Sequence, residues 1–149
     1  MKKITVKNAV IVAILVALIS IIAGLIFYIN QPRQYLLEVY GVQFPAQAKI
    51  TSLHNEAGWD GRLCYGTLRV QSNYHDGIVN TRNFTAISES RDSRIASLIQ
   101  DVNKTFSISK VSTASSDVSY QKITIKGDSL IVVFYDSKSK NYFFYGSRY

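Results

Sequence analysis

The sequence has almost no cysteine. Cys64 is the only one among 149 residues, so the chain can form no internal disulfide. A chain of this length holds one ordinary domain, which excludes a multidomain enzyme and a zinc-finger array, and the single thiol excludes a disulfide-stapled mini-protein. We expect Cys64 to be buried, because a free cysteine behaves as a small hydrophobic residue.

Motifs that carry chemistry are missing as well. The sequence has no glycine-rich phosphate loop, no serine nucleophile elbow and no dinucleotide-binding fingerprint. Residues 1–30 contain no glutamate, which excludes the type IV pilin pattern. His54, Glu56 and Asp60 lie near one another, but there is no His-x-x-x-His or Cys-x-x-Cys spacing, so we predict no metal site and no cofactor.

A nucleophilic cysteine is the chemical alternative. Cys64 would need His54 or His75 as its base from a neighbouring strand. Its alternation with Leu68 and Val70 places the thiol toward the core, which favours an inert side chain. We therefore predict that the protein is not an enzyme, and an envelope enzyme is the least favoured function.

Acidic residues are scarce, since ten Asp and Glu stand against 17 Lys and Arg, a net charge of +7. Part of the excess lies beside the longest apolar run, at Lys2, Lys3, Lys7 and Arg33. The other basic residues are scattered along the chain, whereas a nucleic-acid-binding surface clusters them. We predict no nucleic-acid partner.

A long uncharged run begins near the N-terminus. Residues 8–32 carry no charge, and 19 of the 21 residues from Ala9 to Ile29 are aliphatic or aromatic. As a helix, residues 9–29 would be about 31 Å long, enough to cross the hydrocarbon core of a bilayer. We predict one transmembrane helix there, preceded by a cytoplasmic tail (residues 1–8) and followed by a short linker (residues 30–33).

A cleaved signal peptide is the alternative for this run. Such a peptide has a shorter apolar core and ends in a small-x-small site, but Ala23 and Ser20 have Ile21 and Leu18 where the second small residue is needed. An uncleaved anchor is therefore favoured. Three lysines precede the helix and one arginine closely follows it, so the positive-inside rule places residues 34–149 outside the cytoplasmic membrane.

Small residues line one face of the predicted membrane helix. Ala13, Ala17, Ser20 and Gly24 follow one another at i, i+4, i+7 and i+11. Small side chains let two helices approach closely, so this face predicts helix–helix packing and a homo-oligomer. The alternative is that alanine and serine simply recur in apolar helices.

The remaining 116 residues predict an α+β domain, in which one amphipathic helix packs on a mostly antiparallel sheet. We expect a short helix over residues 34–40 that ends at Gly41. Apolar residues with helical spacing predict the amphipathic helix over residues 92–104, capped by Ser90 or Asp92. The expected strands cover residues 48–54, 63–71, 78–87, 120–126, 130–135 and 142–145, with loops at residues 55–61, 110–117 and 136–141.

Three short motifs carry a resemblance to a known group. They are Phe44-Pro45-x-x-Ala48-x-Ile50, the loop Gly58-Trp59-Asp60-Gly61, and Tyr135-Asp136 followed by Tyr142-Phe143-Phe144-Tyr145. Together they resemble small membrane- or lipid-anchored bacterial extracytoplasmic proteins, although those proteins have leucine at the position of Phe44. The resemblance implies the fold and the location, and it carries no assigned activity.

Aromatic side chains are the best candidates for a binding site. Trp59 lies beside Asp60 in a glycine-rich loop, and tryptophan is enriched at the centres of protein interfaces. The alternative is that Trp59 folds back and covers the sheet edge. Tyr145 and Tyr149, which we expect to be exposed near the C-terminus, are weaker candidates for binding.

We therefore expect a non-enzymatic domain, tethered to the outer face of the cytoplasmic membrane, that binds a membrane or membrane-proximal protein. The short linker keeps this domain beside the lipid bilayer. A small anchored domain of this kind suits an immunity or exclusion factor. The alternative is a bitopic structural subunit of a secretion, conjugation or division machine, which should not tolerate an unrelated helix in place of residues 9–29.

Overall fold

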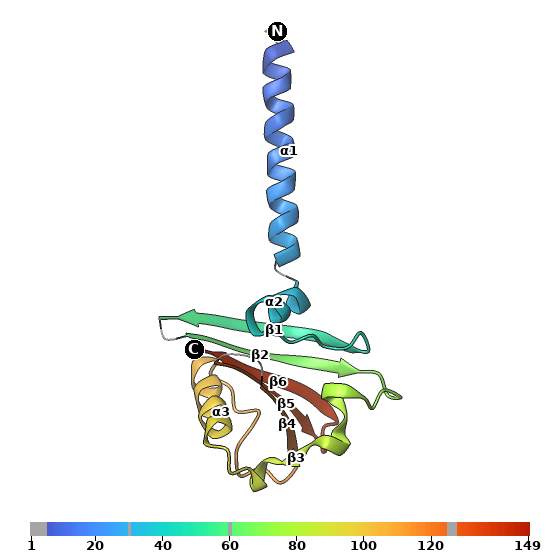
Figure 1. Ribbon diagram of the computed structural model, residues 1–149, viewed down its shortest axis with the longest axis vertical. Coiled ribbons are helices and arrows are strands. Elements are labelled where there is room, and N and C mark those ends of the chain that lie inside the picture. The colour runs from blue at the N-terminus through green and yellow to red at the C-terminus, as the bar shows by residue number, and fades with distance from the viewer. Residues whose placement is uncertain (1–5, 30, 60, 125–127) are drawn as a thin grey trace.

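The computed structural model describes residues 6–29, 31–59, 61–124 and 128–149. One long helix, α1 (Val6–Ile29), stands away from an α+β part that contains the remaining elements (Figure 1). The α+β part is built on a six-stranded antiparallel sheet in the order β1-β2-β6-β5-β4-β3, which confirms the α+β class and the antiparallel sheet. The strands are β1 (Ala48–Gly58), β2 (Gly61–Val70), β3 (Thr85–Ala86), β4 (Val118–Thr124), β5 (Ser129–Asp136) and β6 (Asn141–Arg148).

The helix α1 has 24 residues and would be about 36 Å long. Its stretch from Val10 to Phe27 is apolar, and none of that stretch is buried against the rest of the protein. Among the described residues, α1 is the one helix that is long and apolar enough to cross a membrane.

A short helix, α2 (Pro32–Tyr40), connects α1 to the sheet. It begins two residues earlier than expected, so Pro32 and Arg33 of the predicted linker belong to it. Proline suits the first turn of a helix, because a backbone N–H group at that position would have no partner within the helix and proline has none to leave unpaired. Gly41 ends the helix in a left-handed conformation with φ of 69°, as its position in the sequence predicts.

The two central strands, β5 and β6, are buried on both faces of the sheet. The first six residues of β5 are all buried, as the run of apolar residues from Leu130 onward predicts. The C-terminal strand β6 lies between β5 and β2, so it joins the meander β4–β5–β6 to the hairpin β1–β2. Residues 125–127 of the predicted turn between β4 and β5 lie outside the described residues.

A helix covers each face of the sheet, which corrects the expectation of one helix on one face. The amphipathic helix α3 (Ser93–Thr105) buries its apolar stripe against one face, where it meets Phe134 and Phe143. On the other face α2 buries Leu36 and Tyr40 against a second apolar layer. Because β5 and β6 are apolar on both faces, the sheet needs a cover on both sides.

The expected loop at residues 55–61 is instead the end of a long hairpin. The strand β1 stays paired with β2 as far as Gly58 opposite Gly61. Gly61 adopts a φ of 145°, which L side chains rarely adopt, so glycine permits the tight reversal. The Gly/Asp composition therefore indicates the position of the turn. Backbone hydrogen bonds extend both strands closer to this turn than the side-chain pattern predicts.

The expected strand at residues 78–87 is wrong for most of its length. Three short 3-10 helices, η1 (Gly77–Val79), η2 (Thr81–Asn83) and η3 (Ile87–Glu89), surround the two-residue strand β3. The side chains of Asp76 and Asn80 accept backbone N–H groups at the starts of η1 and η2. Such local hydrogen bonds offer the backbone an alternative to strand pairing.

Candidate functional site

Trp59 lies at the tip of the β1–β2 hairpin, which projects to one side of the sheet at the end nearest α1 (Figure 1). The side chain is 109% exposed, so it contacts no core residue. This exposure excludes the alternative in which Trp59 folds back over the sheet edge. Its role as a binding residue stays a prediction, and Asp60 beside it lies outside the described residues.

Three residues surround the base of this tip. Arg62, Arg148 and Tyr149 line a shallow hollow together with Trp59. Arg148 donates from Nη1 to the carbonyl of Val39 at 2.7 Å, near the C-terminal end of α2. The Tyr149 ring is 63% exposed, as expected, and its hydroxyl donates to Asp101 at 3.3 Å. The tip therefore combines two aromatic side chains with two arginines.

Tyr145 is buried, which corrects the expectation that it is exposed. None of its surface is accessible, because it points from β6 toward α3, where its ring lies 5.1 Å from that of Phe134. Its hydroxyl donates to Asn103 Oδ1 at 3.0 Å, and burial raises its pKa. Tyr145 is therefore a core residue and cannot serve as a surface anchor.

Cys64 is buried, as predicted, and it faces the α2 side of the sheet. Burial raises the pKa of the thiol to about 12, so it stays protonated at neutral pH. His54 lies opposite Tyr65 on the hairpin and stacks on its ring at 4.5 Å, on the α3 side. The sheet itself therefore separates His54 from Cys64, and the pair cannot work as nucleophile and base.

The metal-ligand candidates do not converge in the described structure. His54 and Glu56 are exposed on β1, and Asp60 is not described. Within the described ranges, no three His, Cys, Asp or Glu residues are grouped so that they could hold a metal ion.

The small-residue face of α1 is open. Ala13, Ala17, Ser20 and Gly24 are exposed, and the Ser20 hydroxyl donates back to the Val16 carbonyl at 2.9 Å. A methyl group at Gly24 would meet no atom within 4 Å. Helix–helix packing through this face stays a prediction.

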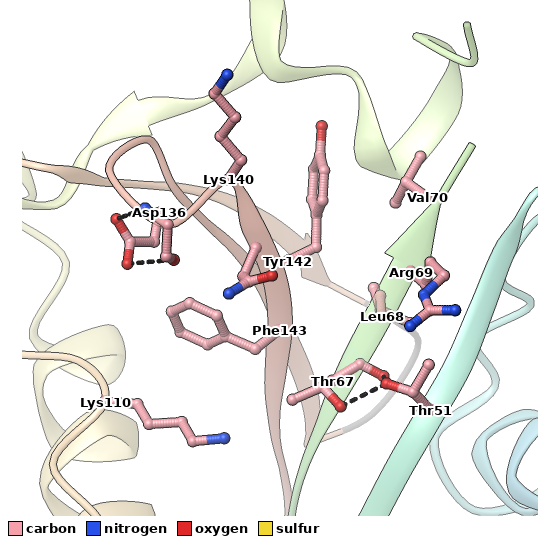
Figure 2. Close-up of a pocket in the computed structure, with 12 residues that line it drawn as sticks. Thr51, Thr67, Leu68, Arg69, Val70, Lys110, Asp136, Lys140, Tyr142 and Phe143 are labelled. Carbon is pink, nitrogen blue, oxygen red and sulfur yellow. Dashed lines mark hydrogen bonds between the residues drawn. The ribbon is translucent and has the colours of Figure 1, made fainter. Parts of the chain in front are cut away.

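A groove of about 570 Å³ lies where strands β2 and β6 separate, and Figure 2 shows the side chains that line it. The last pair between these strands is Leu68 opposite Tyr142. Beyond it, β2 stays paired with β1 as far as Val70, and β6 stays paired with β5 from Asn141. The two hairpins therefore diverge, and the gap between them forms a wedge-shaped opening at this corner of the sheet.

Basic side chains line the groove. In Figure 2, Lys110 lies below the ring of Phe143, Arg69 lies across the groove on β2, and Lys140 stands at the far rim. All three basic residues are exposed, and the Lys110 ammonium lies 5.6 Å from the centre of the Tyr65 ring. The groove therefore has a positive rim around an aromatic floor.

Asp136 is the one acidic residue among the described residues that line the groove. Its carboxylate accepts the Ser139 hydroxyl at 2.6 Å and the N–H groups of Lys138 and Ser139. The Ser139 hydrogen bond, with these N–H groups, holds its pKa below the ordinary value. Because the β5–β6 turn already uses this carboxylate, the basic side chains remain available to a ligand.

Hydroxyl groups form the side of the groove on β1 and β2. The Thr51 and Thr67 hydroxyls, which line the groove, lie 2.6 Å apart (Figure 2). The register between the strands shifts at this point, between Ile50 and Ser52. These groups can donate hydrogen bonds to an oxygen-bearing ligand.

The groove could not be found from the sequence. Arg69 comes from β2, Lys110 from the segment between α3 and β4, and Lys140 from the β5–β6 turn. The only local signal is the polar turn at residues 136–141, which reads as a solvated loop.

Neither a family model, nor a curated protein, nor a solved structure matches this chain. Its function must therefore be inferred from its own residues and geometry.

Proposed function

We propose that this protein is a single-pass membrane protein whose α+β domain binds an acidic segment of another protein at the outer face of the cytoplasmic membrane. The observation that carries the binding role is the basic groove between β2 and β6. The membrane role is supported by α1, which is apolar and unburied over residues 10–27. The orientation is supported by three lysines (Lys2, Lys3 and Lys7) on the N-terminal side of the uncharged run at residues 8–32, against one arginine, Arg33, close after it.

Charge selects the chemistry of the partner. Arg69, Lys110 and Lys140 bring three positive charges to the rim, and the single carboxylate of Asp136 is already hydrogen-bonded within its own turn. An acidic segment would replace the water around these side chains with charge-assisted hydrogen bonds. Complementary charge also increases the rate of encounter and rejects basic partners.

The shape of the groove favours an extended chain over a compact ligand. Its rim residues are exposed, whereas a pocket for a small molecule encloses most of its ligand. Phe143 lies at its floor but is only 5% exposed, and its β1–β2 side offers the hydroxyls of Thr51 and Thr67. An extended peptide segment that carries acidic residues fits this arrangement.

We propose binding rather than catalysis as the activity. The only thiol, Cys64, is buried and protonated, and His54 lies on the other face of the sheet. A small tethered binding domain would suit an immunity or exclusion factor, which protects a cell by occupying a toxin or an incoming apparatus. Deleting the gene should then increase sensitivity to such agents, and unchanged sensitivity across a broad panel would contradict the protective role.

Site-specific photo-crosslinking in intact membranes tests the binding role. A photoreactive residue at Asn141, on the rim, should crosslink one protein in cells that produce the full chain. The double variant Arg69→Glu and Lys110→Glu should lose most of this product, because the rim would repel an acidic segment. The control, Arg91→Glu with Lys104→Glu, makes the same charge change at exposed positions away from the groove and should keep the product.

The identity of the crosslinked protein completes the test. The crosslinked peptide should come from an acidic segment of the partner. Crosslinks that survive charge reversal in the groove, or that map to a basic segment, would overturn the proposal.

A further inference from the structure

We infer that the β1–β2 hairpin tip inserts Trp59 into the headgroup layer of the membrane that holds α1, so that the domain touches the bilayer at a second point. The inference rests on the proposed membrane role of α1. It concerns a different surface from the basic groove, because Trp59 and Arg69 lie toward opposite ends of the hairpin strands. The ligand of the tip is a lipid surface.

Exposure of apolar surface is the first argument. Outside α1, the large apolar side chains that are exposed among the described residues are Leu37, Trp59 and Tyr149. An isolated exposed leucine is ordinary, but a fully exposed indole leaves a large apolar area in water. The Trp59 ring is fully exposed, so within the described residues nothing shelters it from water.

Placement is the second argument. The tip projects from the end of the domain that faces α1, where β1 is the outermost strand of the sheet (Figure 1). Helix α1 ends at Ile29 and α2 begins at Pro32. The chain between these two residues spans at most about 11 Å. With α1 in the bilayer, α2 and the hairpin therefore lie at the depth of the headgroups. Leu37, 42% exposed on α2, lies on this same end of the domain.

Chemistry is the third argument. Tryptophan and tyrosine prefer the membrane interface, because the ring is apolar while its N–H or O–H group forms hydrogen bonds with headgroups. Arg62 and Arg148 line the same hollow as Trp59 and Tyr149, so two positive charges lie at this end of the hairpin. Among the described residues near the tip, the exposed Glu56 and the half-buried Asp101 oppose this charge, and the sequence places a further acidic residue, Asp60, directly after Trp59. Anionic headgroups are the lipids that two arginines would attract most.

The single tryptophan of the sequence makes the inference directly measurable. With excitation at a wavelength that tryptophan absorbs and tyrosine does not, emission from the full chain in liposomes reports Trp59 alone. Lipids that carry bromine high on their acyl chains should quench most of this emission, because bromine quenches an indole only at close contact. Exchanging the brominated lipid for the ordinary lipid should restore the emission.

Two variants of the full chain provide matched controls. Trp59→Phe with Phe27→Trp moves the only indole to the end of α1 and should be quenched by the same lipids. Trp59→Phe with Ser88→Trp moves it to an exposed site on η3, at the end of the domain away from α1 (Figure 1), and should not be quenched.

The controls separate the two proposals. If the indole at residue 27 is quenched and Trp59 is not, the tip stays in water and the inference is wrong, which would leave Trp59 to a protein partner. If neither is quenched, α1 is not in the membrane and the proposed function fails with it. Quenching of the indole at residue 88 would mean that the domain is not held in the inferred orientation.

Lipid charge tests the role of the arginines. The fraction of Trp59 emission that is quenched should be larger in vesicles of phosphatidylglycerol with phosphatidylcholine than in vesicles of phosphatidylcholine alone. The double variant Arg62→Gln and Arg148→Gln should remove this difference. Equal quenching of the unmodified chain in both vesicles would overturn the part assigned to the two arginines.

Discussion

At the scale of single residues, Asp92 joins α3 to the sheet in two ways. Its Oδ1 atom accepts the backbone N–H of Arg94 at 3.0 Å and so caps α3. Its Oδ2 atom pairs with the ammonium of Lys122 on β4. The hydrogen bond from Lys122 holds the pKa of this carboxyl below its ordinary value. The other predicted cap, Ser90, instead accepts the Tyr120 hydroxyl at 3.0 Å.

We predict that Asp92→Ala destabilises the domain more than Asp92→Asn does. Asparagine still caps a helix, whereas alanine loses the cap at a cost of about 1 kcal/mol. A carboxyl whose pKa is lowered by folding stabilises the fold above its unfolded pKa, about 3.9, and loses that contribution as the pH falls through the folded pKa. The unmodified chain should therefore have a larger free energy of unfolding than Asp92→Asn at neutral pH, and this difference should disappear in acid.

Urea unfolding of the full chain in detergent micelles, followed by circular dichroism, measures these differences. Glu89→Gln is the control, because this exposed residue on η3 changes the same charge without a cap. An advantage over Asp92→Asn that is equally large at neutral and acid pH would show that the ion pair contributes nothing.

Trp59 and Tyr145 show which properties of a residue can be predicted locally. The glycines around Trp59 place it at a tight reversal, where a side chain has few neighbours. Tyr145 stands close to the C-terminus, and this position alone suggested exposure. Its burial depends on α3, which crosses the sheet over β6 and is 40 residues away in the sequence. A residue whose cover comes from a distant element cannot be placed from its own neighbourhood.

At the scale of elements, α2 connects α1 to the sheet and is itself packed firmly on the sheet. Arg33 donates from Nη2 to the carbonyls of Pro45, Ala46 and Ala48, which fixes the first turn of α2 to the start of β1. Leu36 is fully buried in the apolar layer on the same face. This packing makes α2 a part of the domain rather than a flexible linker.

We predict that Leu36→Ala destabilises the domain by about 2–5 kcal/mol, because the leucine is fully buried and leaves a cavity. The neighbouring variant Leu37→Ala is the control. It should change stability by less than about 0.5 kcal/mol, since this side chain is 42% exposed. Denaturant unfolding in micelles measures both, and equal losses would show that α2 does not pack on the sheet through Leu36.

The elements that could be predicted are those with a strong local period or a clear end signal. The apolar stripe of α3 and the glycine after α2 specify their helices without help from other segments. The segment at residues 78–87 is different, because Asp76 and Asn80 compete for its backbone with local hydrogen bonds. Whether such a segment pairs as a strand depends on how many residues of the neighbouring strand are free to pair with it. Here β4 pairs with only two residues of the segment, Thr85 and Ala86.

At the scale of the whole molecule, the proposed orientation predicts which side of the membrane each end occupies. In intact cells, a membrane-impermeant maleimide should label Ser137→Cys, on the exposed β5–β6 turn, and should label Lys3→Cys only after lysis. Cys64 needs no replacement, because its buried thiol should not react with the reagent. Labelling of residue 3 in intact cells, with protection of residue 137, would reverse the topology.

The sequence by itself determined the elements that depend on local order: the long apolar helix near the N-terminus, the helix ended by Gly41, the amphipathic helix α3 and the meander of β4, β5 and β6. Only the tertiary structure decided how they combine. Insertion of β6 between β5 and β2, the second helix on the opposite face, the burial of Tyr145 and the basic groove all join residues that are far apart in the chain. Periodicity and turn chemistry act over a few residues, whereas strand order and surface composition depend on which distant segments exclude water together.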